Sequence, residues 1–342
     1  MCVAARLVSF TGEEGGNAVT TSITRRAGIG GVLSLLAAPA VRANTYPSQQ
    51  VRLVVGFPPG GGTDALARAI LERFREKLGG PVIVDNKPGA GSNLAHEYVA
   101  KLGGDGHTLL ISSNSQALFP LLIAKLGYDP DKDFAPVGFI ARQDSVLVGS
   151  ANAPWPDAKA IVVAAKADPG KVQFGTAGLT TPMHLAGEQF GMLNGVKLTH
   201  VPFRGTGPLV TDLLGGHVQL GVSSLTSVQP HFAGGKIKAY ALAAEKRSEL
   251  SPEIPTFREL GLGPVEGTIV YTLIVPAATP RDIVRRINGA LNETVRAPDM
   301  SEDLRKRGFV AMGGTPEELG EWLKKQRPLW GPVLQAAGIK PE

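Results

Sequence analysis

Short apolar runs along this chain are followed by glycine-rich loops and then by amphipathic segments. The first such unit begins with VRLVV at residues 51–55, which predicts a buried strand. Residues 60–62 are three consecutive glycines, and residues 65–78 then place Leu66, Ile70 and Phe74 at helical spacing. Glycines commonly end helices, and two of them follow at residues 79–80. The pattern therefore predicts a strand, a loop and a helix in succession.

The same unit recurs along the chain. Further strands are predicted at residues 82–84, 108–112, 172–174, 198–202, 218–222 and 238–243, further helices at residues 93–101, 157–167, 183–193, 280–295 and 316–334, and extended segments at residues 136–140, 145–148 and 269–275. Repeated strand–loop–helix units build a sheet with helices on both faces, so we predict an α/β fold.

The repeat restarts after a turn-rich connection, which predicts two lobes, each a mostly parallel sheet with helices on both faces. We expect one lobe to comprise residues 44–147 and 270–342, and the other to comprise residues 148–269. The hinge between them is expected near residues 145–150 and 269–275, where the chain crosses from one lobe to the other.

Composition narrows the function classes. The length of 342 residues suits two domains, and 43% hydrophobic with 19% charged residues is ordinary for a soluble globular protein. The net charge of +5 is scattered and forms no basic run interleaved with aromatics, so we expect no nucleic-acid partner. Cys2 is the single cysteine, which excludes an intramolecular disulfide and cysteine-based metal sites. We expect a monomer without metal or cofactor.

Residues 1–43 have the pattern of a targeting segment. Arg25 and Arg26 precede an apolar stretch at residues 29–38, and Ala43 is a small residue suited to cleavage. This predicts a cleaved secretory signal, through the twin-arginine or the general secretory route, and a true start that can lie after Met1. No cysteine follows the apolar stretch, so a lipoprotein-type anchor is not expected.

Two of the loops are suited to binding an anion. In the first, residues 60–62 carry no side chains, so their N–H groups can approach a ligand at the start of a helix. In the second, residues 175–181 follow a strand, with Thr181 as a helix cap and Pro182 at the first helical position. An isolated glycine loop can be an ordinary strand-to-helix turn, but two such loops in separate lobes predict a cleft that holds a ligand from both sides.

Several motifs, taken in order, resemble the Bug-type solute receptors, the periplasmic binding proteins of tripartite tricarboxylate transporters. They are FPPGGGTD at residues 57–64, NKPGAG at 86–91, YDP at 128–130, VPFRG at 201–205 and DLLGG at 212–216. The resemblance implies a two-lobed periplasmic binding protein of the Venus-flytrap type II class, without enzymatic activity. It also implies capture of a small organic carboxylate for delivery to the membrane components of such a transporter.

In that family the carboxylate is held largely by backbone N–H groups and bridging waters from the first loop and the second-lobe loop. Together with polar residues at strand ends, this gives the following candidate ligand-binding residues: Phe57, Gly60, Gly61, Gly62, Thr63, Asp64, Ser113, Asn114, Ser115, Gln116, Gly175, Thr176, Ala177, Gly178, Thr180, Thr181, Phe203, Arg204, Ser223 and Ser224.

Some of these residues have a second, structural interpretation. Asp64 can contact a ligand or stabilise the N-terminus of its own helix. Phe57 can cover the ligand or belong to the core, and Arg204 can pair with a distal carboxylate or be solvated. His184 is interpreted as a structural hydrogen-bonding residue rather than a metal ligand, because no other histidine has ligand spacing.

The main alternative function is an exported NAD(P)-dependent oxidoreductase. Residues 60–65 satisfy G-x-G-x-x-A after a strand, and Asp85 follows about 20 residues later, where such enzymes bind ribose. Against this, Pro58 and Pro59 lengthen the turn before the glycines. The chain also lacks a phosphate-loop lysine, a nucleophile elbow and a His-Glu-x-x-His motif.

Overall fold

The computed structural model describes residues 46–336 and 339–341. The predicted targeting segment lies outside these residues. Contacts along the chain group residues 44–342 into one compact unit. Within the described ranges, no helix combines the length and apolar character needed to cross a bilayer.

The first sheet has six strands in the order β11-β4-β10-β3-β1-β2. β1 runs parallel to both β2 and β3, whereas β10 is antiparallel to β3 and β4, and β11 is antiparallel to β4. The carboxyl ends of the three parallel strands therefore lie at one edge of the sheet. The strands are β1 (Val51–Val55), β2 (Val82–Asn86), β3 (Thr108–Ser113), β4 (Phe134–Gln143), β10 (Ile269–Pro276) and β11 (Val310–Ala311).

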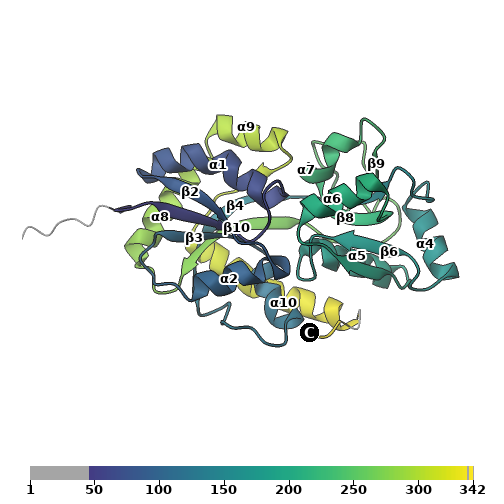
Figure 1. Ribbon diagram of the computed structural model, residues 1–342, viewed down its shortest axis with the longest axis horizontal. Coiled ribbons are helices and arrows are strands. Elements are labelled where there is room, and N and C mark those ends of the chain that lie inside the picture. Colours follow the sequence, from purple (N-terminus) through teal and green to yellow (C-terminus); the bar gives the residue numbers. More distant parts are fainter. Residues whose placement is uncertain (1–45, 337–338, 342) are drawn as a thin grey trace, which may run out of the picture. The chain divides into compact units, whose positions relative to one another are not determined.

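Successive residues of the central strands face opposite sides of this sheet, as strand geometry requires. Leu53 and Val55 belong to a buried cluster with residues of α1 and α8, whereas Val54 clusters with residues of α2, α3 and α10. Figure 1 shows α1 and α9 above the first sheet and α2 and α10 below it. The helices are α1 (Gly62–Leu78), the 3-10 turn η1 (Ala90–Ser92), α2 (Asn93–Ala100), α3 (Ser115–Leu122), α8 (Arg281–Val295), α9 (Pro298–Lys306) and α10 (Pro316–Ala336).

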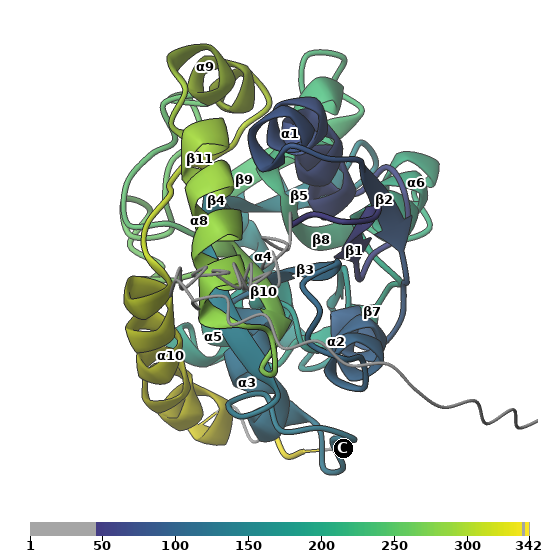
Figure 2. The same cartoon turned by 90° about the vertical axis from the view of Figure 1, so that its left-hand side faces the viewer.

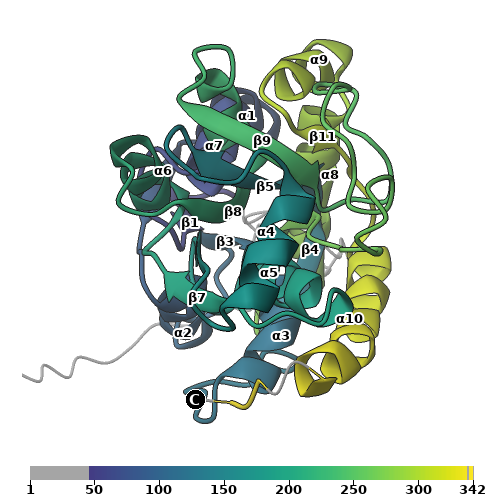
Figure 3. The ribbon, with the colours of Figure 1, turned by 90° about the vertical axis from the view of Figure 1, so that its right-hand side faces the viewer.

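The second sheet has five strands in the order β7-β6-β8-β5-β9. β6 is parallel to β7 and β8, and β5 is antiparallel to β8 and β9. Figure 3 shows α4 and α5 on one side of this sheet and α6 and α7 on the other. The elements are β5 (Ser145–Ser150), α4 (Ala158–Ala167), β6 (Gln173–Thr176), α5 (Pro182–Leu193), β7 (Thr199–Pro202), α6 (Thr206–Gly215), β8 (Leu220–Ser224), α7 (Leu225–Val228), η2 (Gln229–His231) and β9 (Ile237–Leu242).

The chain crosses between the sheets twice. Asp144 alone separates β4 from β5, and residues 243–268 lead back to β10. The Ser145 hydroxyl donates to the Gly267 carbonyl at 2.6 Å, which ties the two crossings together. The C-terminal helices α8 and α10 return to the first sheet and pack on β4 (Figure 2).

The predicted α/β architecture is confirmed, with one difference in strand direction. β10 and β5, the strands in which the chain enters a sheet after each crossing, are antiparallel to both of their neighbours. Both sheets are therefore mixed rather than mostly parallel. No helix was predicted after the strand at residues 108–112, but Ser115 begins α3. Polar residues and Pro120 hide this helix in the sequence, and burial of Leu118 and Phe119 stabilises it. The short elements α7, α9 and β11 were not predicted either.

Candidate functional site

The first glycine loop, residues 56–61, joins β1 to α1 and presents unpaired N–H groups. α1 begins after Gly61 without a side-chain cap. Among the described residues, the N–H groups of Gly61, Gly62 and Thr63 meet no hydrogen-bond acceptor. This is the arrangement by which helix N-termini bind anions.

The second sheet contributes the residues that face these N–H groups. A Cβ atom built on Gly61 would lie 3.2 Å from Thr206 Oγ1, and one on Gly62 would lie 3.2 Å from Ser224 Oγ. Ser224 is hydrogen-bonded to Ser227 at 2.8 Å, and Ser227 donates to Thr206. The N-terminus of α1 therefore faces a group of hydroxyls from α6, β8 and α7.

A buried tyrosine lies beside the same helix end. The Tyr271 hydroxyl donates to Gln143 Oε1 at 2.7 Å, and Gln143 in turn donates to Thr226. Burial raises the pKa of Tyr271, and contact with the Thr63 hydroxyl acts in the opposite direction. Tyr271 therefore stays protonated and remains a hydrogen-bond donor.

The Asp64 carboxylate forms hydrogen bonds with residues of the first glycine loop, α1 and β2. Its carboxylate accepts from the Gly60 N–H at 3.0 Å, from Arg68 at 2.9 Å and from Asn86 at 2.9 Å. Burial opposes ionisation, but these hydrogen bonds hold the pKa of Asp64 below its usual range. Of its two interpretations, the geometry matches the stabilisation of the loop and helix.

The threonine loop, residues 177–181, joins β6 to α5 on the second sheet. Thr181 caps α5 by accepting from the His184 N–H, as its sequence predicts. Gly178 has φ +143°, a conformation that L side chains rarely adopt. Its Cβ position would lie 3.3 Å from the Gly91 Cα, and the Thr180 hydroxyl reaches the Gly91 carbonyl at 3.4 Å. The threonine loop thus lies directly against a loop of the first sheet.

That partner is the second glycine loop, residues 87–92, between β2 and α2. Ala90 has φ +47° and Ser92 has φ +81°, both unusual for residues with a side chain. Such strain persists where the surroundings hold it and is typical of functional sites. His96 on α2 is fully buried and bonds the Ser92 carbonyl through Nδ1 at 2.9 Å and the Ser112 hydroxyl through Nε2 at 2.7 Å. It therefore links the end of the loop to β3.

The loops line a half-open cavity of about 230 Å³, which suits a small molecule. Its lining residues are Gly56, Phe57, Gly89, Ala90, Gly91, Leu122, Ile123, Ala177, Gly178, Leu179, Thr180, Pro202, Phe203 and Arg204. A larger hollow of about 610 Å³ lies under α10 and shares none of these residues. We assign the site to the smaller cavity because residues of both sheets meet there.

The cavity brings together part of the candidate set. Phe57, Ala177, Gly178, Thr180, Phe203 and Arg204 line it, while Gly60, Gly61, Gly62, Thr63 and Ser224 lie at the adjoining end of α1. Thr176 and Thr181 bond Gly178 of the threonine loop, whereas Gly175 lies in β6. Arg204 is exposed, and no carboxylate in the described part of the chain lies within ion-pair distance of it.

Other candidates are bonded to the protein itself. Asn114 donates to the Thr268 carbonyl at 3.1 Å and Gln116 donates to the Pro130 carbonyl at 3.0 Å, so both fix backbone of the fold. Ser113 Oγ accepts from the Ser115 N–H. The buried hydroxyls of Ser115 and Ser223 have no hydrogen-bond partner among the described residues. These two remain open to a further bond.

Sequence reasoning missed the second glycine loop and Thr206 as candidate site residues. The motif NKPGAG was recognised, but the chain alone does not indicate that it faces the threonine loop. The side chains that lie against Gly61 and Gly62 are those of Thr206 and Ser224, and not those of the threonine loop.

Comparison with known proteins identifies the family. The family model described as "Tripartite tricarboxylate transporter family receptor" matches residues 66–339. The chain belongs to this receptor family. The resemblance drawn from the motifs is therefore confirmed, and the dinucleotide-dependent oxidoreductase is not favoured.

Individual proteins agree with this membership. The receptor is similar to the "UPF0065 protein in tcbD-tcbE intergenic region" of Pseudomonas sp. (strain P51), at 36% identity over 90% of this chain and 92% of that protein. It is similar to the structure "R. palustris Rpa4515 with adipate", at 32% identity and TM-score 0.83, covering 87% of this chain and all of that one. It is also similar to periplasmic binding protein BugD, at 30% identity and TM-score 0.82 with the same coverage. The periplasmic binding protein fold is thereby confirmed.

Proposed function

We propose that this receptor captures a small organic carboxylate between two lobes and delivers it to the membrane components of a tripartite tricarboxylate-type transporter. The observation that carries the proposal is the set of unpaired N–H groups at the start of α1, which face the hydroxyls of Thr206 and Ser224 beside a small cavity lined by the threonine loop. Oriented N–H groups stabilise a carboxylate without a buried salt bridge. A related structure contains adipate, which matches this chemistry.

Each lobe is built around one of the two sheets. The first lobe takes residues 44–147 and 270–342 as its approximate extent, and the second takes residues 148–269. Closure is a rotation about the two crossings, at Asp144 and near Thr268, and it brings Gly91 against Gly178.

The receptor binds and releases its ligand without chemical conversion, and it acts as an exported periplasmic monomer. The first part rests on family membership. Export rests on the predicted targeting segment and on the similarity to a periplasmic binding protein.

Native mass spectrometry of the purified protein, followed by calorimetry with adipate, succinate, citrate and glutamate, tests the ligand class. We expect at least one of these acids to bind in the micromolar range or tighter. The variant Gly61→Val places a side chain against Thr206, and we expect its affinity for that acid to fall by at least 100-fold.

Gly103→Val is the matched control, because no atom lies within 4 Å of a Cβ at that position. Normal binding by Gly61→Val, in a folded protein, would refute the role of the first glycine loop. Failure of every acid to bind would refute the proposed ligand class.

A further inference from the structure

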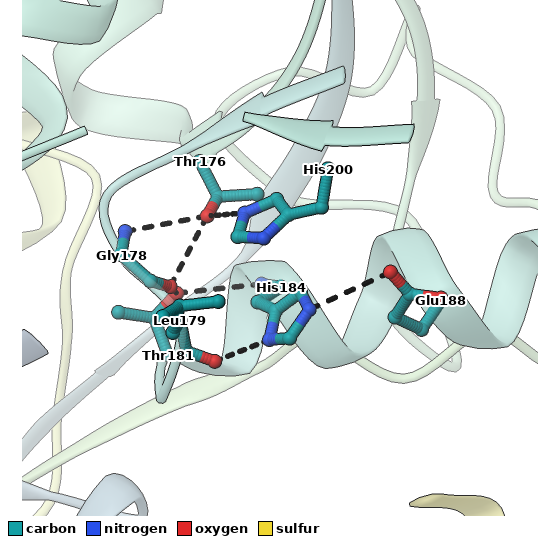
Figure 4. A network of polar contacts seen from close by, with 7 residues as sticks. All are labelled: Thr176, Gly178, Leu179, Thr181, His184, Glu188 and His200. Carbon is teal, nitrogen blue, oxygen red and sulfur yellow. Dashed lines mark hydrogen bonds and ion pairs between the residues drawn. The ribbon is translucent and has the colours of Figure 1, made fainter. Parts of the chain in front are cut away.

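Thr176 connects the threonine loop to the neighbouring strand (Figure 4). Its hydroxyl oxygen lies 3.3 Å from the Gly178 N–H donor, 3.2 Å from the Gly178 carbonyl and 2.7 Å from His200 Nε2 on β7. A hydroxyl that accepts from Gly178 and from a protonated Nε2, and donates to the Gly178 carbonyl, uses all of its hydrogen-bonding capacity. Thr176 thus fixes the Gly178 N–H, and it shares the Gly178 carbonyl with the Thr181 hydroxyl, which donates to that carbonyl at 2.8 Å.

His184 fixes the next peptide along the loop. It lies on the first turn of α5, nearly buried, and its Nδ1 bonds the Leu179 carbonyl. Its ring stacks on His200 with centroids 4.0 Å apart and an interplanar angle of 20°. The two imidazoles therefore form one rigid unit beneath the loop.

These bonds determine where the neighbouring N–H groups point. In a planar trans peptide the C=O and the following N–H point in opposite directions. Because the Leu179 carbonyl points to His184, the Thr180 N–H points away from it, and the Thr180 nitrogen lies 3.4 Å from the Cβ position of Gly91 at the cavity. The same argument turns the Leu179 N–H away from Thr176, which binds the Gly178 carbonyl.

We propose that Thr176, His184 and His200 are positioning residues that hold the carbonyls of the threonine loop inward and so present the N–H groups of Leu179 and Thr180 to the ligand carboxylate. This proposal rests on the proposed function. It adds three residues that position the threonine loop without touching the ligand themselves. Two consecutive N–H groups presented in this way form an anion-binding concavity.

The surroundings keep the His200 imidazole uncharged. Burial, and to a lesser degree the neighbouring His184, lower the pKa of His200 to about 3. Glu188, one turn along α5, places its carboxylate 3.5 Å from His184 Nε2. Lys340 lines the hollow of about 450 Å³ on the open side of the pair and is exposed.

Two pairs of variants test the proposal. Thr176→Val removes the hydroxyl at constant shape, and Thr176→Ser retains it. His184→Leu removes the donor to Leu179, and His184→Asn places an amide N–H near the position of Nδ1. Thr211→Val, on the exposed side of α6, is a remote control for the Thr→Val change.

The measurements are calorimetric affinity for adipate, thermal melting, and amide hydrogen exchange of residues 176–184 without adipate. We expect Thr176→Val and His184→Leu to weaken adipate binding at least tenfold and to speed exchange at Gly178 and Thr181. The two conservative variants are expected to remain within about threefold of the wild type, and Thr211→Val to be unchanged. The affinities are measured well below each melting temperature, so global unfolding does not enter them.

Each result decides the inference. Faster exchange with unchanged affinity would show that the support does not position the binding groups. Unchanged exchange in both disruptive variants would show that it does not hold the loop at all. If the wild type binds none of the acids, the proposed function fails, while exchange still tests the loop support because it needs no ligand.

Discussion

Acid should destabilise this receptor through two buried histidines. Burial lowers the pKa of His96 to about 4 and that of His200 to about 3. In the unfolded chain both titrate near 6.5. The unfolded state therefore binds more protons below pH 6.5, so the free energy of unfolding falls as the pH drops from 6.5 toward the native pKa values.

The magnitude follows from these values. Each histidine contributes a loss of about 1.4 kcal/mol per pH unit in this window. At pH 5 the loss is about 2 kcal/mol for each histidine and about 4 kcal/mol for both, relative to pH 7. That is a large fraction of the ~5–15 kcal/mol by which domains are usually stable.

Urea unfolding at pH 7 and at pH 5, followed by circular dichroism, measures this difference. The variants His96→Gln and His200→Gln each remove one titrating group, so each should reduce the difference by about 2 kcal/mol, whatever its effect on stability at pH 7. Asp144 and Glu266, whose pKa values are raised mainly by burial, shift stability in the opposite direction but do so equally in all three proteins. A pH 7 to pH 5 loss that is unchanged in both variants would refute the reasoning.

Three further predictions concern single side chains. Gly187→Ala should lower the free energy of unfolding by about 1–3 kcal/mol, because its Cβ would lie 2.1 Å from the Phe174 ring. Gly289→Ala in α8 is the control, because its Cβ would meet open space. In the same urea titration it should leave the free energy of unfolding unchanged or raise it by up to about 1 kcal/mol. Asp64→Asn should cost about 1–3 kcal/mol of stability by weakening the bonds to Gly60 and Arg68, and intact stability would contradict the structural role of this carboxylate. Arg204→Met should weaken adipate more than hexanoate by about tenfold in calorimetry, and equal effects on both acids would exclude pairing with a distal carboxylate.

The sequence determined the local elements of this protein and its family. VRLVV at residues 51–55 predicts a strand, and Thr181 with Pro182 is a typical helix start; the structure has both. These signals lie within a few residues of each other, so they can be read without knowing the fold. The order of the glycine and proline motifs was likewise sufficient to indicate the receptor family.

Tertiary structure decided which loops meet and which polar residues are available. Gly91 and Gly178 are far apart in sequence and become neighbours only because the fold brings the loop after β2 against the loop after β6, so no local pattern indicates their contact. Asp64 and Asn114 have side chains suited to a ligand, but the fold brings the Asn86 amide beside Asp64 and the Thr268 carbonyl beside Asn114, and these groups occupy the two side chains. The pairing of His184 with His200 depends equally on the packing of α5 against β7, and so does the position of the bond from His184 to the Leu179 carbonyl.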